Sequence, residues 1–184
     1  MRITAGTYRN RRLKTPKSMD IRPATDKVRQ AVFNMLLAYD LPVDAHVIDG
    51  FCGTGSYGLE ALSRGAATCT FIDQGREAIA ICHDNIRALS CDDQSTVIAK
   101  NITALRAKPD KDPSADLIFL DPPYGKNLLS PAIDALLSGN WASEKTVFVI
   151  EHGKKETFTH PALTLALEKE RLYGDICIKI MQKA

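Results

Sequence analysis

Residues 46–65, "HVIDGFCGTGSYGLEALSRG", join a short apolar run to a glycine-rich turn and then to a segment with helical periodicity. Gly53, Gly55 and Gly58 fit the spacing G-x-G-x-x-G. Such a turn brings the backbone close to a ligand, and the helix that follows offers free N–H groups to an anion. The stretch therefore predicts a strand, a ligand-binding turn and a helix.

Strand-like and helix-like segments alternate after this turn. Apolar runs predict strands over 46–51, 68–73, 95–100, 115–121 and 146–152, and helical spacing predicts helices that include 76–89 and 128–138. The last stretch, 165–182, alternates around Gly174–Asp175 and predicts a hairpin. We expect an α/β fold with a mostly parallel, doubly wound sheet and an antiparallel C-terminal strand at or near its edge.

The segment before the sheet has a different character. Residues 2–15 predict a small hairpin or a pair of short strands, and Thr25 or Asp26 caps an amphipathic helix. We therefore divide the chain into a basic N-terminal hairpin and helix, residues 1–40, and a main α/β domain, residues 41–184.

The composition limits the class of protein. The chain has 184 residues, of which 45% are hydrophobic, and no apolar run approaches the ~20 residues of a membrane span. The basic N-terminus has no apolar stretch after it, so we expect no signal peptide, no membrane partner and a cytoplasmic location. The five cysteines include no C-x-x-C pair, which predicts reduced thiols and no metal site.

The charge is unevenly distributed. Residues 1–30 carry nine Lys and Arg residues against two acids, a formal charge of +7, whereas the remainder of the chain is −5. A basic arm on a mildly acidic body is typical of a protein that meets a polyanion with one end, although a solvated charged tail has the same composition.

Two acidic residues at predicted strand ends bear on the cofactor. Asp49 precedes the glycine turn, where a carboxylate disfavours the pyrophosphate of a dinucleotide and favours the cationic S-adenosylmethionine. Asp73 ends the second strand, where it can accept both hydroxyls of a ribose or cap the helix that follows.

A second motif, "IFLDPPYGKN" at 118–127, ends the fourth strand abruptly. The Asp121 carboxylate and the Pro122 carbonyl are two neighbouring acceptors that can hold both hydrogens of one amino group and stabilise the positive charge that develops on its nitrogen. Tyr124 offers a face for stacking an extruded base. The alternative reading is a plain strand stop with a buried tyrosine.

These motifs resemble a known family. "DPPY" after the fourth strand and "D-x-F-x-G-T-G" after the first resemble the amino-directed S-adenosylmethionine-dependent methyltransferases with a Rossmann-like class I sheet. "MRITAGTYRNRRLKTP", "RPATDKVRQAVFN", "DPPYGK", "EHG" and "RLYGD" are similar to the bacterial 16S rRNA guanine-N2 methyltransferases, the RsmD family, over nearly the whole chain. The resemblance implies an enzyme that methylates a guanine in the assembling small ribosomal subunit.

The resemblance also implies roles for single residues. S-adenosylmethionine would be held by Asp49, Phe51, Gly53, Thr54, Gly55 and Asp73, and the guanine by Asp121, Pro122 and Tyr124. The family usually has Asp, an acceptor for the adenine amino group, where this chain has Asn101, whose carbonyl can still accept. We read no histidine as catalytic, because an activated methyl donor needs positioning more than a base.

With this substrate, the basic residues of the arm become candidates for phosphate contacts: Arg2, Arg9, Arg11, Arg12, Lys14, Arg22 and Arg29. We expect a monomer that binds 16S rRNA or a small-subunit particle. Three alternatives stay open: a DNA adenine-N6 or protein glutamine-N5 methyltransferase, a non-catalytic RNA-binding assembly factor, and an NAD oxidoreductase.

Overall fold

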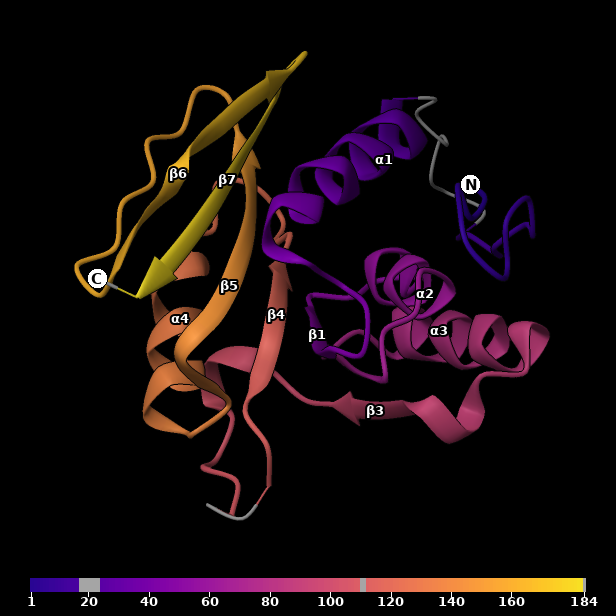
Figure 1. Ribbon diagram of the computed structural model, residues 1–184. Coiled ribbons are helices and arrows are strands. Elements are labelled where there is room, and N and C mark those ends of the chain that lie inside the picture. The colour runs from indigo at the N-terminus through magenta and orange to yellow at the C-terminus, as the bar shows by residue number, and fades with distance from the viewer. Residues whose placement is uncertain (17–23, 110–111, 184) are drawn as a thin grey trace.

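The structure, a computed structural model, describes residues 1–16, 24–109 and 112–183. A seven-stranded sheet in these residues has the order β3-β2-β1-β4-β5-β7-β6 (Figure 1). The strands are β1 (His46–Gly50), β2 (Thr68–Asp73), β3 (Ser95–Ala99), β4 (Ala115–Leu120), β5 (Ala142–Gly153), β6 (Leu163–Tyr173) and β7 (Ile176–Lys183). Strands β1 to β5 are parallel and β7 runs antiparallel to β5 and β6, which confirms the predicted α/β class and C-terminal hairpin.

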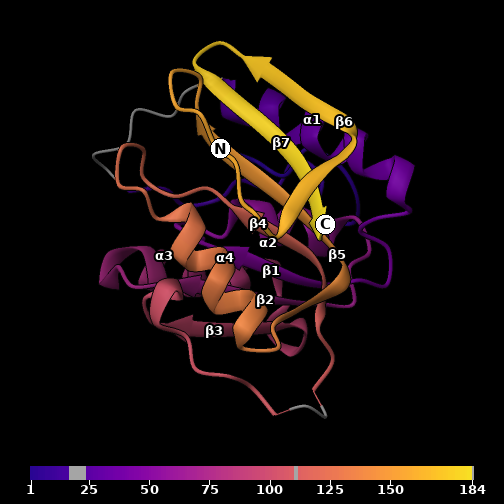
Figure 2. The ribbon, with the colours of Figure 1, turned by 90° about the vertical axis from the view of Figure 1, so that its left-hand side faces the viewer.

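Helices cover both faces of this sheet. They are α1 (Ala24–Leu36), α2 (Ser56–Ser63), α3 (Arg76–Leu89) and α4 (Leu129–Ser138), with 3-10 turns η1 (Leu37–Tyr39), η2 (Asp92–Gln94) and η3 (Ile102–Ala104). In Figure 2 the sheet is seen from the α4 side, and α1 lies behind β7. None of the helices in the described ranges is long and apolar enough to cross a bilayer.

The two-residue period of the central strands separates the core into two layers. In β4, Leu117 and Phe119 join the cluster that includes α1, α2 and α3, whereas Ile118 and Leu120 join the cluster that includes α4. Each of these four side chains is at most 1% exposed. A strand that is buried on both faces needs such an unbroken apolar run, which is why residues 117–120 of β4 show no polar alternation.

The N-terminal segment pairs with itself as the predicted small hairpin, although the pairing is short. Arg2 and Arg12 form an antiparallel bridge, the Ile3 N–H donates to the Arg11 carbonyl (3.0 Å) and the Leu13 N–H donates to the Met1 carbonyl (3.1 Å), with bends and turns over residues 5–10. The turn is fixed against α2: the Thr7 N–H donates to the Ser63 carbonyl (2.8 Å), and Gly6, at φ +79°, lies so close that a Cβ would be 1.7 Å from that oxygen. The tip of this hairpin is therefore packed closely against α2.

The first helix packs with the body of the protein. Val32, Phe33 and Leu36 of α1 and Ile3 of the N-terminal segment are fully buried in the same cluster as β4 and β5. Helix α1 begins at Ala24, ahead of both predicted caps, so that Asp26 lies in its first turn. The division of the chain at residue 40 stays a prediction.

Candidate active site

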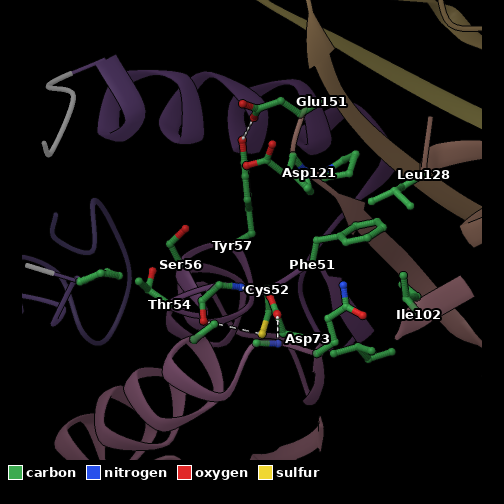
Figure 3. Close-up of a pocket in the computed structure, with 18 of the residues that line it drawn as sticks. Phe51, Cys52, Thr54, Ser56, Tyr57, Asp73, Ile102, Asp121, Leu128 and Glu151 are labelled. Carbon is green, nitrogen blue, oxygen red and sulfur yellow. Dashed lines mark hydrogen bonds between the residues drawn. The ribbon is translucent and has the colours of Figure 1, made fainter. Parts of the chain in front are cut away.

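A single cavity of about 990 Å³ joins the two motifs. It lies at the carboxyl ends of β1, β2 and β4, and its wall includes Gly53 of the glycine turn and Asp121 of the "DPPY" loop (Figure 3). In the strand order, β1 and β4 are the neighbours at which the direction of the sheet's winding reverses. Ligands of open α/β sheets bind at this switch point, so the cavity has the position expected of an active site.

The glycine turn is built by backbone conformations that favour glycine. Gly53 has φ +54° and Gly55 φ +80°, and Phe51 adopts a φ of +59° despite its side chain. Gly58, inside α2, lets the helix approach the sheet, because a Cβ there would lie 2.4 Å from Phe71 Cε1. Each glycine of the motif therefore occupies a position where a side chain would be disfavoured by the backbone conformation or by a close neighbour. The turn holds Phe51 and Gly53 on the cavity wall.

Asp49 lies behind this wall. It is 3% exposed, and its Oδ2 accepts a hydrogen bond from the Gly58 N–H (2.8 Å). Burial raises the pKa of Asp49 to about 7, an effect that the Gly58 hydrogen bond partly opposes. Of the predicted cofactor residues, Asp49 and Gly55 are absent from the cavity wall among the described residues, whereas Phe51, Gly53, Thr54, Asp73 and Asn101 are part of it.

Asp73 connects two loops of the cavity. Its Oδ2 accepts from the Gly53 N–H (2.9 Å) and its Oδ1 from the Gly75 N–H (2.8 Å). Each carboxylate oxygen keeps further acceptor capacity, so these bonds fix the carboxylate without preventing a ligand hydroxyl from binding. The N-cap position of α3 is Gly75 and not Asp73, so the capping alternative is not what the structure shows.

Asn101 has a local role that the sequence did not indicate. Its Oδ1 accepts from the N–H and from the hydroxyl of Thr103, both at 3.0 Å, and caps η3. These two bonds occupy the oxygen that we expect to accept from the adenine amino group. A cofactor contact of Asn101 stays a prediction.

The "DPPY" residues follow β4 directly into the cavity. Asp121, Pro122 and Tyr124 all line it, so the three predicted catalytic residues are brought together with the glycine turn. Tyr124 is 42% exposed, which leaves its ring accessible to a base. Burial raises the pKa of the Asp121 carboxyl well above its ordinary range, with further contributions from the negative charges of Glu151 and Asp49.

Glu151, near the end of β5, is a cavity residue that sequence reasoning missed. It is 7% exposed and accepts hydrogen bonds from two phenols, Tyr57 (2.9 Å) and Tyr124 (3.0 Å). Figure 3 shows Tyr57 directed toward Glu151, with Asp121 beside its hydroxyl. The available signal was an acid at the end of a buried apolar run, on the strand that neighbours β4.

The basic residues of the arm divide into two groups. Arg2, Arg9, Arg11, Arg12 and Lys14 are exposed, with an ion pair between Lys14 and Asp84 (3.0 Å). Arg29 is 2% exposed and pairs with Glu60 (3.2 Å) and Asp26 (3.0 Å). Its guanidinium is held inside the protein, and Arg29 lines the cavity rather than the outer surface. A phosphate contact of Arg29 stays a prediction, and Arg22 lies outside the described residues.

Comparison with known proteins identifies the family. A family model described as "Conserved hypothetical protein 95" matches residues 1–182. "Ribosomal RNA small subunit methyltransferase D" of Haemophilus influenzae is 33% identical over 99% of this chain and 93% of its own length, and the protein of that name from Escherichia coli K12 is 31% identical over 100% and 90%. The chain belongs to this family of methyltransferases.

Solved structures agree with this assignment. The "putative methyltransferase yhhF from Escherichia coli" superposes with a TM-score of 0.84 at 30% identity and covers 100% of this chain and 97% of that one. A magnesium protoporphyrin IX methyltransferase from Synechocystis, 18% identical and solved with bound S-adenosylmethionine, shares the fold with a TM-score of 0.67. The predicted class I methyltransferase fold, family and enzyme class are thereby confirmed, and the oxidoreductase alternative is excluded.

The residues present fit S-adenosylmethionine. The carboxylates of Asp121 and Glu151 line the cavity and Asp49 lies behind it. A cation in the cavity offsets the repulsion among these negative charges, whereas a pyrophosphate adds further repulsion. Phe51 and Ile102 supply apolar surface, and Asp73 supplies an acceptor for hydroxyls. Among the described residues, no group of three or more His, Cys, Asp or Glu side chains is arranged to hold a metal ion.

Proposed function

We propose that this chain transfers the methyl group of S-adenosylmethionine to the exocyclic N2 of a guanine in 16S rRNA. The observation that carries the proposal is the single cavity in which the "DPPY" carboxylate Asp121 meets the glycine turn of the cofactor site. The substrate class follows the names of the relatives, which are small-subunit rRNA methyltransferases. The exposed arginines at the N-terminus suit a polyanionic partner.

The residues of the chain position the amino group. The Asp121 carboxylate and the Pro122 carbonyl accept one amino hydrogen each, which draws the nitrogen lone pair out of conjugation with the base. When bound, S-adenosylmethionine supplies a methyl group activated by a positively charged sulfur. As the nitrogen gains the methyl group it becomes positive, and the partly buried Asp121 carboxylate stabilises that charge until one amino proton leaves to water.

Tyr124 holds the base in place. Its exposed ring provides a stacking surface, and stacking of a base on an aromatic side chain contributes about 1–3 kcal/mol. The hydroxyl donates to Glu151, and the adjacent Gly125 N–H donates to Glu156 Oε1 (2.7 Å), so the loop is connected to β5 and to the segment after it. A loop held at two points presents the ring in one orientation and reduces the entropy lost when the base binds.

The proposal extends to the setting of the reaction. We place it in the cytoplasm, on an assembling small-subunit particle, with the enzyme acting as a monomer. The exposed basic residues lie on one short N-terminal segment, and proteins of the particle can add contacts that orient the enzyme.

The test is the modification state of 16S rRNA from a strain that lacks this chain. We expect one guanine to be lighter by one methyl group in the mass spectrum of the nuclease digest, and the methyl to return with the wild-type gene. Asp121→Asn should not restore it, whereas Asp93→Asn, a change of an exposed acid outside the cavity, should. An unchanged 16S rRNA, or N6-methyladenine lost from DNA, would overturn the proposal, and restoration by Asp121→Asn would favour a non-catalytic assembly factor.

A further inference from the structure

Glu151 lines the same cavity as Asp121, and in the mechanism above it only supports the Tyr124 loop. It is carried by β5, which pairs in parallel with β4, so the two carboxylates come from the same end of adjacent strands. A buried carboxylate is costly unless hydrogen bonds compensate for the lost water. Two carboxylates side by side also repel each other, and a ligand that donates hydrogen bonds to both of them would offset this cost.

The hydrogen bonds of Glu151 fix its orientation without using its full capacity. Tyr57 of α2 donates to Oε2 and Tyr124 donates to Oε1, one donor for each oxygen. Tyr57 is itself immobilised, because it is 8% exposed and its ring stacks on Phe119 at a centroid distance of 4.8 Å. An ionised carboxylate accepts about four hydrogen bonds in total. Glu151 is therefore held in one orientation with acceptor capacity left for a ligand in the cavity.

The Watson–Crick edge of guanine supplies the matching donor. On that edge the N2 amino group lies directly beside N1–H, whereas in adenine and cytosine the ring nitrogen beside the amino group is an acceptor. An extruded base is read by hydrogen bonds to this edge. A fixed carboxylate adjacent to the residues that hold the amino group would meet a donor in guanine and a lone pair in the other two bases.

We propose that Glu151 selects guanine, by accepting a hydrogen bond from N1–H of the extruded base while Asp121 and Pro122 hold its amino group. This inference rests on the proposed function. It makes Glu151 a specificity-determining residue that touches the base but takes no part in bond formation. A base without N1–H would leave the carboxylate of Glu151 facing a lone pair, and a site built for a hydrogen bond rejects a ligand that lacks the donor.

The test compares bases that share the 2-amino group. 16S rRNA is assembled from ligated fragments that carry guanine, 2-aminopurine or 2,6-diaminopurine at the position that the wild-type enzyme is first shown to methylate. Both analogues keep the amino group, but their N1 is an acceptor. We expect the wild-type enzyme to prefer guanine by about 100-fold in kcat/KM, the scale of one well-placed hydrogen bond to a base edge. Equal rates with guanine and both analogues would overturn the inference without any variant.

The variant Glu151→Gln separates selection from support of the loop. Its amide can accept from N1–H or, after rotation, donate to an N1 lone pair, so we expect the guanine preference to fall to within a few-fold. Asp121→Asn should slow methylation of all three bases and leave their ratio unchanged. If Glu151→Gln loses rate but keeps the full preference, Glu151 only positions Tyr124 and the inference fails. If the wild-type enzyme methylates no guanine N2, the proposed function fails first, at the mapping step.

Discussion

Glu60 connects three parts of the protein, and its removal should be among the most destabilising single changes. Its side chain is 0% exposed in the middle of α2. It accepts from the Thr4 N–H (2.8 Å), the Thr4 hydroxyl (2.6 Å), the Ala5 N–H (3.1 Å), Arg29 Nε (3.2 Å) and Arg64 Nε (2.9 Å). The N-terminal segment, α1 and α2 thus share one buried carboxylate.

Glu60→Ala removes the acceptor and leaves the buried Arg29 with Asp26 (3.0 Å) in place of two carboxylate partners. Breaking a buried ion pair in this way costs about 3–5 kcal/mol. Because the Arg29 side chain is 2% exposed, solvent cannot replace the lost partner without local rearrangement. For a protein of this size, that loss lowers Tm by roughly 6–20 °C.

The assays are urea unfolding and amide hydrogen exchange. We expect Glu60→Ala to lower the unfolding midpoint at unchanged m value, and the amides of Thr4 and Ala5 to lose protection. Glu144→Ala is the matched control, because Glu144 pairs with Lys183 on the surface and such pairs contribute about 0–1 kcal/mol. Replacing both partners, Arg29→Met with Glu60→Leu, should recover part of the loss. A cost below about 1 kcal/mol for Glu60→Ala, with Thr4 and Ala5 still protected, would refute this account.

Three further predictions concern single sites. In steady-state assays, Tyr124→Ala should lower kcat/KM about 10- to 100-fold because the stacking surface is lost. Tyr124→Phe should keep kcat/KM within a few-fold of the wild-type value. Equal losses in the two variants would show that the hydroxyl matters more than the ring. Gly58→Ala should destabilise the protein by about 1–3 kcal/mol in urea unfolding, because a Cβ would lie 2.4 Å from Phe71 Cε1, and wild-type stability would contradict that packing. Burial raises the pKa of Asp49 to about 7, so between pH 5 and pH 7 the folded state retains a proton that the unfolded state has released. The free energy of unfolding should therefore fall by about 2 kcal/mol over this range, relative to that of Asp49→Asn. Parallel pH profiles of the unfolding free energy for the two proteins would exclude this effect.

The sheet could be predicted from the sequence because its signals are local. The apolar run of β4, the glycine spacing after β1 and the breaks at Pro122 and Gly174 each reflect the conformation of a few neighbouring residues. The positions of Asp121 and the glycine turn at one cavity also follow, since parallel strands end at one edge of the sheet. Strand β5 begins at Ala142, four residues before the predicted start, and its register with β4 shifts between Ala115 and Leu117.

The residues that were missed depend on partners far away in the chain. The charge of Arg29 suggested a surface contact, but its partner Glu60 is 31 residues later and becomes a neighbour only when α1 packs on α2. Glu151 is separated by 94 residues from Tyr57, one of the two phenols that orient it. The sequence shows the type of each residue but not the distant residues that it contacts. Which charged side chains are buried was therefore harder to predict than the strands and turns.

The distribution of charge in the folded chain explains how one protein could handle both a polyanion and a single base. Exposed positive charges are found on the N-terminal segment, whereas the inner wall of the cavity carries the carboxylates of Asp121 and Glu151. On the proposed function, a phosphate of the RNA is attracted by the first group and repelled by the second, so the backbone stays outside while an uncharged base enters. The two carboxylates also favour a cationic methyl donor. The same wall includes the basic residues Arg29, Arg76 and Lys100, so this proposed selection by charge acts where Asp121 and Glu151 themselves lie.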